Sequence, residues 1–153
     1  HRRKYDWIAF PEVMVQDRPR IVVTILVQQP VQTVWQYWTK PEHIREWNIP
    51  FPNWYCPVVT NDLQEGGRFC FCMKTKDDLE GFAHAGIYNR VQTHELLSYT
   101  LDDGRQSTIE FQQIDQNTIV RESFEPEPGL PLEMQEKFCQ SVLEKFKNYV
   151  EGQ

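Results

Sequence analysis

The segment VQTVWQYWTKPEHIREWNIPFPNWYC, residues Val31–Cys56, contains four of the five tryptophans in the chain. Its first apolar residues recur at i, i+3, i+4 and i+7, which is one face of an amphipathic helix: Val31, Val34, Trp35 and Trp38. Pro30 suits the start of such a helix, because the first turn needs no N–H from that position. The segment therefore begins with a predicted short helix.

A second short helix is predicted directly after the first. Thr39 and Glu42 have the spacing of N-cap and N3 in a capping box, and the helix would bury Ile44 and Trp47. The prolines of residues 48–54 prevent it from continuing. Two short helices cannot bury so many indole rings against each other, so they require a large apolar surface elsewhere in the chain.

The composition predicts one globular domain. A chain of 153 residues can bury a substantial core, and 13% aromatic with 25% charged residues is typical of a folded protein. The net charge of −6 argues against nonspecific nucleic-acid binding, which requires a basic face. No apolar run approaches the roughly 18 residues of a membrane span. Nucleic acid and a membrane span are therefore not expected.

Residues 1–19 are predicted to be an extension outside the domain, which covers residues 20–151. They show no clear periodicity, although Trp7, Ile8 and Phe10 are candidates to dock on the domain. Their basic residues are not followed by the sustained apolar stretch of a signal peptide. We therefore expect a cytoplasmic protein.

The cysteines are expected to be reduced, packed thiols. Cys56, Cys70, Cys72 and Cys139 form no CxxC motif, and no pair of histidines stands near them at ligand spacing. Cys70 and Cys72 share one face of a predicted strand, but two thiols without further ligands make a poor zinc site. No metal and no cofactor are predicted.

Runs of β-branched and aromatic residues, bounded by turn residues, predict seven strands. They cover residues 20–27, 58–63, 69–73, 82–91, 96–101, 107–114 and 118–124. Tight turns join the last six, as at Asp102-Asp103-Gly104, so these strands should pair as an antiparallel meander. Gly86 lies inside the longest strand and indicates a bulge or close packing there.

A final helix is predicted over residues 131–150. Its apolar residues form a broad face at helical period: Phe138, Cys139, Val142, Leu143, Phe146, Tyr149 and Val150. At 1.5 Å per residue the helix would be about 30 Å long, enough to cross a whole sheet. The predicted order is one strand, two short helices, six strands and a long helix.

This order and several short motifs resemble the START-like, or helix-grip (SRPBCC), superfamily, and within it the bacterial homologues of the heat-shock chaperone ATPase activator. The resemblance covers Arg20 to Glu151. The matching residues include Pro30, Val34-Trp35, Trp38-Thr39-Lys40-Pro41-Glu42-His43-Ile44, Trp47, Asn61-Asp62-Leu63, Gly66-Gly67-Arg68-Phe69, Asp102-Asp103-Gly104 and Glu122–Phe124. It implies an α+β fold in which a curved antiparallel sheet of about seven strands wraps around the C-terminal helix.

The resemblance also implies a cavity between this helix and the sheet that binds an apolar molecule, lipid-like or polyketide-like. The candidate ligand-binding residues are Trp38, Trp47, Trp54, Phe69, Phe71, His84, Tyr99, Glu122, Phe124 and Phe138. Most are large aromatics, which are equally typical of a core. Trp35, at the centre of its helical face, is expected to be core.

Glu122 and His84 are the polar candidates. Strand alternation places Glu122 on the same face as Val120 and Phe124, so it should point inward, where a carboxylate needs a partner or a raised pKa. His84 shares a face with Phe82, and a bulge would decide which way it points. They would orient a ligand or, as weak catalytic candidates, move a proton.

Three functions are consistent with these residues. The first is a small cytosolic protein that binds an apolar ligand. The second is a cyclase or dehydratase in which His84 and Glu122 converge in one cavity. The third is an interaction module for a chaperone or a second copy of the chain, which predicts an exposed apolar patch around Phe51, Trp54 and Tyr55.

Overall fold

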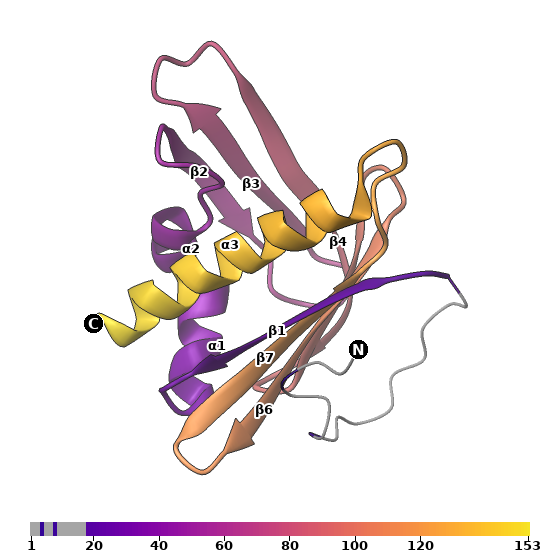
Figure 1. Ribbon diagram of the computed structural model, residues 1–153. Helices are drawn as coiled ribbons and strands as arrows, with labels where there is room; N and C mark the ends of the chain where they lie inside the picture. Colours follow the sequence, from indigo (N-terminus) through magenta and orange to yellow (C-terminus); the bar gives the residue numbers. More distant parts are fainter. Residues whose placement is uncertain (1–3, 5–7, 9–17) are drawn as a thin grey trace.

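Alternation of apolar and polar residues along seven strands builds one curled antiparallel sheet, and a long helix lies across it (Figure 1). The computed structural model describes residues 4, 8 and 18–153. The elements are β1 (Ile21–Val27), α1 (Val31–Thr39), α2 (Pro41–Trp47), β2 (Trp54–Asn61), β3 (Arg68–Thr75), β4 (Gly81–Gln92), β5 (Leu96–Leu101), β6 (Gln106–Ile114), β7 (Asn117–Phe124) and α3 (Leu132–Glu151). The predicted α+β helix-grip fold is confirmed.

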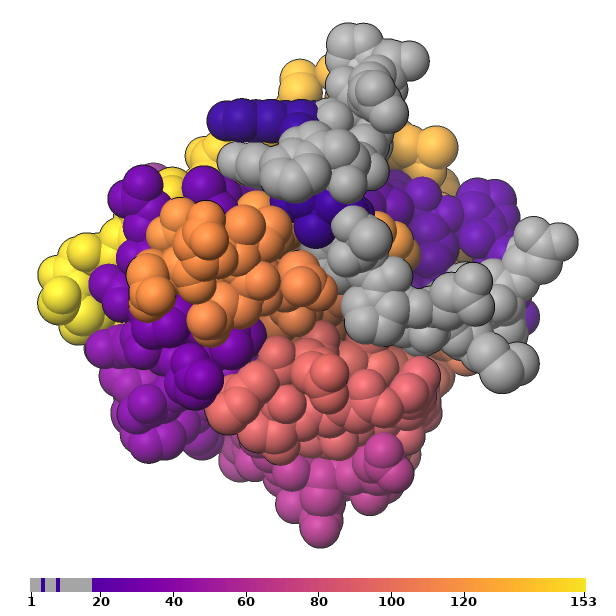
Figure 2. All heavy atoms as spheres, turned by 90° about the horizontal axis from the view of Figure 1, so that it is seen from below, coloured from indigo at the N-terminus to yellow at the C-terminus, as the bar shows by residue number. Residues whose placement is uncertain are grey.

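The sheet has the order β1-β7-β6-β5-β4-β3-β2. Strands β2 to β7 form the predicted meander, and β1 pairs with β7, from Ile21 opposite Phe124 to Val27 opposite Thr118. β1 and β2 therefore occupy opposite edges, and α1 and α2 carry the chain from one edge to the other. Seen from below, the β4–β5 turn (salmon) and the β6–β7 turn (orange) lie beside one another (Figure 2).

Gly86 marks close packing rather than a bulge. It pairs in regular register with Phe69 and Leu101, and the register shift of β4 falls later, between Tyr88 and Arg90. A Cβ at residue 86 would lie 2.3 Å from the backbone oxygen of Thr100. Only glycine fits this approach of β4 to β5.

Aromatic rings fix the C-terminal half of α3. Phe146 is fully buried, and its ring centroid lies 4.8 Å from those of both Trp38 and Trp47. Phe111 of β6 extends this cluster through edge contacts with Trp38 and Trp35. The sheet and α3 thus supply the apolar surface that α1 and α2 require. We call these five residues the aromatic core.

Three expectations need correction. Thr39 does not cap α2: it is the last residue of α1, and its hydroxyl donates to the carbonyl of Trp35, 2.8 Å away. Lys40 is the N-cap instead, without a side-chain bond. Phe138 of α3 is 40% exposed although it belongs to the predicted apolar face. The second strand begins at Trp54, four residues earlier than predicted, through a register shift between Tyr55 and Val58.

The proposed docking of the N-terminal extension is only partly covered by the described residues. Ile8 is buried, whereas Trp7 and Phe10 lie outside the described residues. Arg18, just before β1, forms an ion pair with Glu125 at 3.1 Å. Within the described ranges, none of the helices has the length and apolar character needed to cross a bilayer.

Candidate functional site

The inner face of β3, β4 and β5 carries a second group of rings, centred on Phe69. The centroid of Phe69 lies 4.9 Å from Tyr99, 5.0 Å from Tyr88, 5.2 Å from Phe71 and 5.6 Å from His84. These residues come together because Phe69 pairs with Gly86, Phe71 with His84 and Tyr88 with Tyr99 across neighbouring strands. His84 therefore points to the inner face.

Four polar side chains face this aromatic surface, and we call them the interior polar set: His84, Tyr99, Glu122 and Cys139. The Tyr99 hydroxyl lies 3.4 Å from Nε2 of His84. The Cys139 thiol of α3 donates to Oε2 of Glu122 on β7, 2.8 Å away. The inward orientation expected for Glu122 is therefore observed, and a thiol supplies its partner.

Burial disfavours the charged form of each member of the interior polar set. Burial and, secondarily, the positive charge of Arg105 lower the pKa of His84 to about 4. Burial raises the pKa of Glu122, and the hydrogen bond from Cys139 opposes this rise. Burial and the nearby Glu122 carboxyl raise the pKa values of Tyr99 and Cys139 well above their ordinary values.

Some of these desolvated groups nevertheless keep accessible surface. His84 and Glu122 are only partly buried, as are their neighbours Phe71 and Phe124 on the same inner face. By contrast Phe69 and Tyr99 beneath them are 1% and 8% exposed. A side chain that is strongly desolvated but still accessible does not lie on an outer surface.

His84 and Glu122 do not form an acid–base pair. In the described part of the chain, each has its own partner, Tyr99 for His84 and Cys139 for Glu122, and no hydrogen bond joins the two. Both lie near Tyr99, whose pKa responds to the charge of Glu122. The direct convergence that a cyclase or dehydratase would need is not observed.

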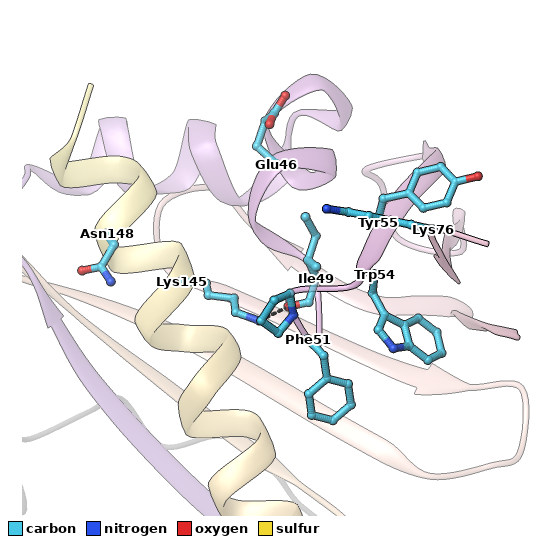
Figure 3. Close-up of a pocket in the computed structure, with 9 residues that line it drawn as sticks. Glu46, Ile49, Phe51, Trp54, Tyr55, Lys76, Lys145 and Asn148 are labelled. Carbon is cyan, nitrogen blue, oxygen red and sulfur yellow. Dashed lines mark hydrogen bonds between the residues drawn. The ribbon is translucent and has the colours of Figure 1, made fainter. Parts of the chain in front are cut away.

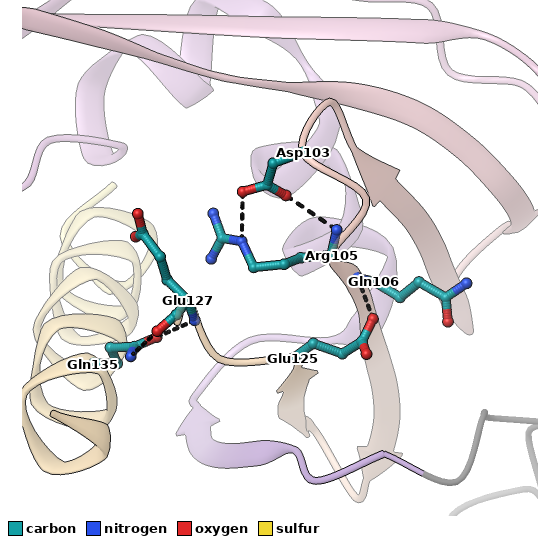
Figure 4. A network of polar contacts seen from close by, with 6 residues as sticks. All are labelled: Asp103, Arg105, Gln106, Glu125, Glu127 and Gln135. Atoms are coloured by element: carbon teal, nitrogen blue, oxygen red, sulfur yellow. Dashed lines mark hydrogen bonds and ion pairs between the residues drawn. The ribbon is translucent and has the colours of Figure 1, made fainter. Parts of the chain in front are cut away.

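A polar network connects the β5–β6 turn with the loop before α3 (Figure 4). Arg105 donates through Nε to Asp103 at 2.7 Å, and the Gln106 amide donates to Glu125 at 2.7 Å. Gln135 of α3 accepts from the Glu127 amide at 2.8 Å and donates to the Glu127 carbonyl at 3.0 Å. The bonds of Gln135 tie the start of α3 to the loop before it, and the Arg105 guanidinium of the β5–β6 turn lies near enough to His84 to influence its pKa.

Three exposed rings and the half-buried ring of Trp54 form a row, which we call the rim aromatics: Phe51, Trp54, Phe82 and Phe138. Phe51 is 51% exposed, and its ring contacts Phe138 at 5.9 Å and Trp54 at 6.5 Å. Trp54 contacts Phe82 at 5.5 Å. The apolar patch expected around Phe51 and Trp54 is thus present.

Beside the rim aromatics is an open recess of about 440 Å³ (Figure 3). It is lined by Glu46, Ile49, Phe51, Pro52, Trp54, Tyr55, Lys76, Lys145 and Asn148. Lys145 reaches from α3 to the α2–β2 loop, where Nζ donates to the Ile49 carbonyl at 2.6 Å, and burial lowers its pKa. The recess has mixed walls, because aromatic rings and the side chains of Lys76 and Lys145 both line it.

The predicted site residues divide into three groups. Trp47, Phe69 and Tyr99 are buried, Trp38, Phe71, His84, Glu122 and Phe124 are partly accessible, and Trp54 and Phe138 belong to the rim aromatics. Cys139 and Arg105 were not among the predicted site residues. The helical face that contains Cys139 was visible in the sequence, whereas nothing there indicated that Arg105 approaches His84. No group of three metal-ligating side chains occurs in the described ranges.

Comparison with known proteins places this architecture in a family. The model of the family described as Activator of Hsp90 ATPase homolog 1-like protein matches residues 28–151. The chain belongs to the AHSA1-like family. An AHSA1-like protein from Aeromonas hydrophila has 34% identity and a TM-score of 0.80, with 86% of this chain and 93% of that chain covered. No curated protein matches.

Two further solved structures are similar to this chain. The AHSA1-like chain is 38% identical to Chr148 from Cytophaga hutchinsonii, with a TM-score of 0.77 and coverage of 87% of this chain and 92% of that one. Protein NE0264 from Nitrosomonas europaea shares the fold at 18% identity, with a TM-score of 0.75 and coverage of 90% and 97%. The last likeness concerns the fold alone.

Proposed function

We propose that this AHSA1-like protein binds an apolar small molecule between α3 and the inner face of the sheet. The observation that carries the proposal is the combination of desolvation with accessible surface at His84 and Glu122. Inward-facing side chains that keep accessible surface support a ligand-accessible space between α3 and the sheet. The surrounding rings, Phe71 and Phe124 among them, give it the mainly apolar walls of small-molecule sites.

The interior polar set defines the ligand further. A neutral His84 offers one donor and one acceptor nitrogen, and the Glu122 carboxyl offers acceptor oxygens. These groups suit a hydroxyl or carbonyl on an otherwise apolar molecule, whereas a buried carboxylate or ammonium would lack a counter-charge. A ligand of the neutral lipid or polyketide type satisfies these requirements.

Native mass spectrometry of protein purified from its host tests the proposal directly. A small molecule released in near-stoichiometric amount on mild denaturation would support it and identify the ligand class. The uncharged dye Nile red provides a second test. We expect Phe71→Trp, which places a larger ring on the inner face between the sheet and α3, to weaken dye binding by at least about tenfold, equivalent to 1.4 kcal/mol.

The matched control is the double variant Phe51→Ser/Phe138→Ser, which removes exposed rings but leaves the inner face intact. It should bind Nile red like the unmodified protein. Dye binding that is lost in this double variant and retained in Phe71→Trp would place the apolar site on the surface and overturn the proposal.

The rim aromatics favour a second candidate function, contact with another protein. Exposed contiguous rings of this kind mark interaction sites in soluble proteins. The family description refers to activation of the Hsp90 ATPase, so an Hsp90-class chaperone is the partner to test. If contact occurs there, the ATPase rate of the chaperone should rise on addition of this protein and should not rise with Phe51→Ser/Phe138→Ser. Light scattering of the unmodified protein and of Phe51→Ser/Phe138→Ser would reveal whether the rim aromatics join two copies of the chain.

A further inference from the structure

The turn between β3 and β4 presents the most exposed large apolar side chain in the described part of the chain. Leu79 is 83% exposed and stands at the end of the long β3–β4 hairpin (Figure 1). Its neighbours in the turn are Asp77, Asp78 and Glu80. The turn therefore displays one apolar side chain framed by three carboxylates.

Hydrogen bonds fix the backbone of this turn. Asp77 accepts from the Thr75 hydroxyl at 2.6 Å and from the Leu79 amide at 3.0 Å. The Thr75 hydroxyl in turn accepts from the Glu80 amide at 3.1 Å. Because the backbone is already ordered, covering Leu79 with a partner costs little further conformational entropy. The turn thus has the rigidity of a preformed contact point between proteins.

The recess of Figure 3 adjoins this turn and carries the opposite charge. Tyr55, which lines the recess, donates from its hydroxyl to Asp78 of the turn at 2.6 Å. The walls of the recess hold two lysines, Lys76 and Lys145, against one carboxylate, that of Glu46. An acidic apolar turn and a basic aromatic recess therefore lie side by side on one chain.

We propose that two copies of the chain pair by inserting the β3–β4 turn of each into the recess of the other. Leu79 of one copy contacts Phe51 and Trp54 of the second copy, and Glu80 of the first faces Lys76 of the second. Since the turn and the recess adjoin, a single two-fold axis forms both contacts at once and closes the pair.

Charge and exposed apolar surface favour a second copy as the occupant of the recess. Opposite charges meet where the turn enters the recess, whereas like charges oppose contact of two turns or of two recesses. The pairing also covers Leu79 and Phe51, which are 83% and 51% exposed in the single chain. It is independent of the apolar ligand on the inner face, and it specifies one protein partner for the exposed rings.

Size-exclusion chromatography with light scattering, at protein concentrations up to millimolar, tests the pairing. We expect the mass to rise with concentration from that of one chain, 18.3 kDa, toward twice that value. Leu79→Ser should keep the mass of one chain throughout. The matched control Ile87→Thr changes another exposed apolar residue, which is 46% exposed and lies on the outer face of β4, and it should pair like the unmodified protein.

Charge reversal tests which surfaces meet. Glu80→Lys and Lys76→Glu should each remain single chains, because like charges then face each other in both contacts. An equal mixture of these two variants should pair again, because a lysine then faces a glutamate in each contact. Circular dichroism confirms that every variant is folded.

Three results would overturn the proposal. In the first, the unmodified protein keeps the mass of one chain up to millimolar concentration. In the second, Leu79→Ser or either charge variant alone pairs like the unmodified protein, or the mixture of charge variants stays unpaired. In the third, the mass grows beyond two chains, because an insertion that does not close on itself builds an open array of copies.

Discussion

Phe146 should be the residue on which the attachment of α3 depends most. Removing its fully buried side chain loses about 1.5–3 kcal/mol of transfer free energy. The two edge-to-face contacts with Trp38 and Trp47, each at 4.8 Å, add about 0.5–1.5 kcal/mol apiece. Phe146→Ala should therefore lower the free energy of unfolding by about 3–5 kcal/mol, the range measured for buried Phe→Ala changes.

Urea denaturation followed by tryptophan fluorescence measures this loss as a lower midpoint with an unchanged slope. Phe138→Ala is the matched control, because it lies on the same helix but is 40% exposed and should cost under about 1 kcal/mol. If Phe146→Ala costs no more than Phe138→Ala, the aromatic core does not hold α3 and the reasoning from burial fails.

Three further changes test individual interactions. Because burial raises the pKa of Glu122 above its ordinary 4.5, the protein should lose stability as pH rises above that value, and Glu122→Gln should remove this loss in thermal melts across pH. Burial lowers the pKa of His84 from 6.5 to about 4, so the free energy of unfolding should fall by up to about 3 kcal/mol as pH drops through that window. His84→Phe should flatten this dependence of stability on pH. Identical pH profiles for the variant and the unmodified protein would refute the assignment of the effect to His84. Gly86→Ala should cost about 1–3 kcal/mol in urea titrations, because its Cβ meets the Thr100 oxygen, and a neutral result would show that β4 and β5 can separate.

Local patterns in the sequence were sufficient to predict the order of the helices and strands. The i, i+3, i+4 spacing of α1 and the alternation along β7 depend only on neighbouring residues, so the faces of Trp35 and Glu122 followed directly. The same patterns do not reveal the distance between the apolar face of a helix and the element that packs against it. Phe138 belongs to the apolar face of α3, yet it remains 40% exposed, and its ring neighbour Phe51 is exposed as well.

The partners of the site residues depend on tertiary structure and were not predicted. Glu122 meets Cys139 across 17 positions of sequence and two different elements. Arg105 comes near His84 because β5 ends beside Gly86 of β4, which places the β5–β6 turn next to His84. The capping box at Thr39 failed for a different, local reason, since its hydroxyl bonds the carbonyl of Trp35 one turn earlier in α1.

The pairing of β1 with β7 has a consequence for synthesis of the chain. Val27 and Thr118 are neighbours in the sheet, yet the ribosome makes one long before the other. The nascent β1, Ile-Val-Val-Thr-Ile-Leu-Val, must therefore wait without its strand partner while the whole meander is translated. During that interval its backbone and apolar side chains are open to mispairing, so the speed of translation between residues 27 and 118 becomes a determinant of the yield of folded protein.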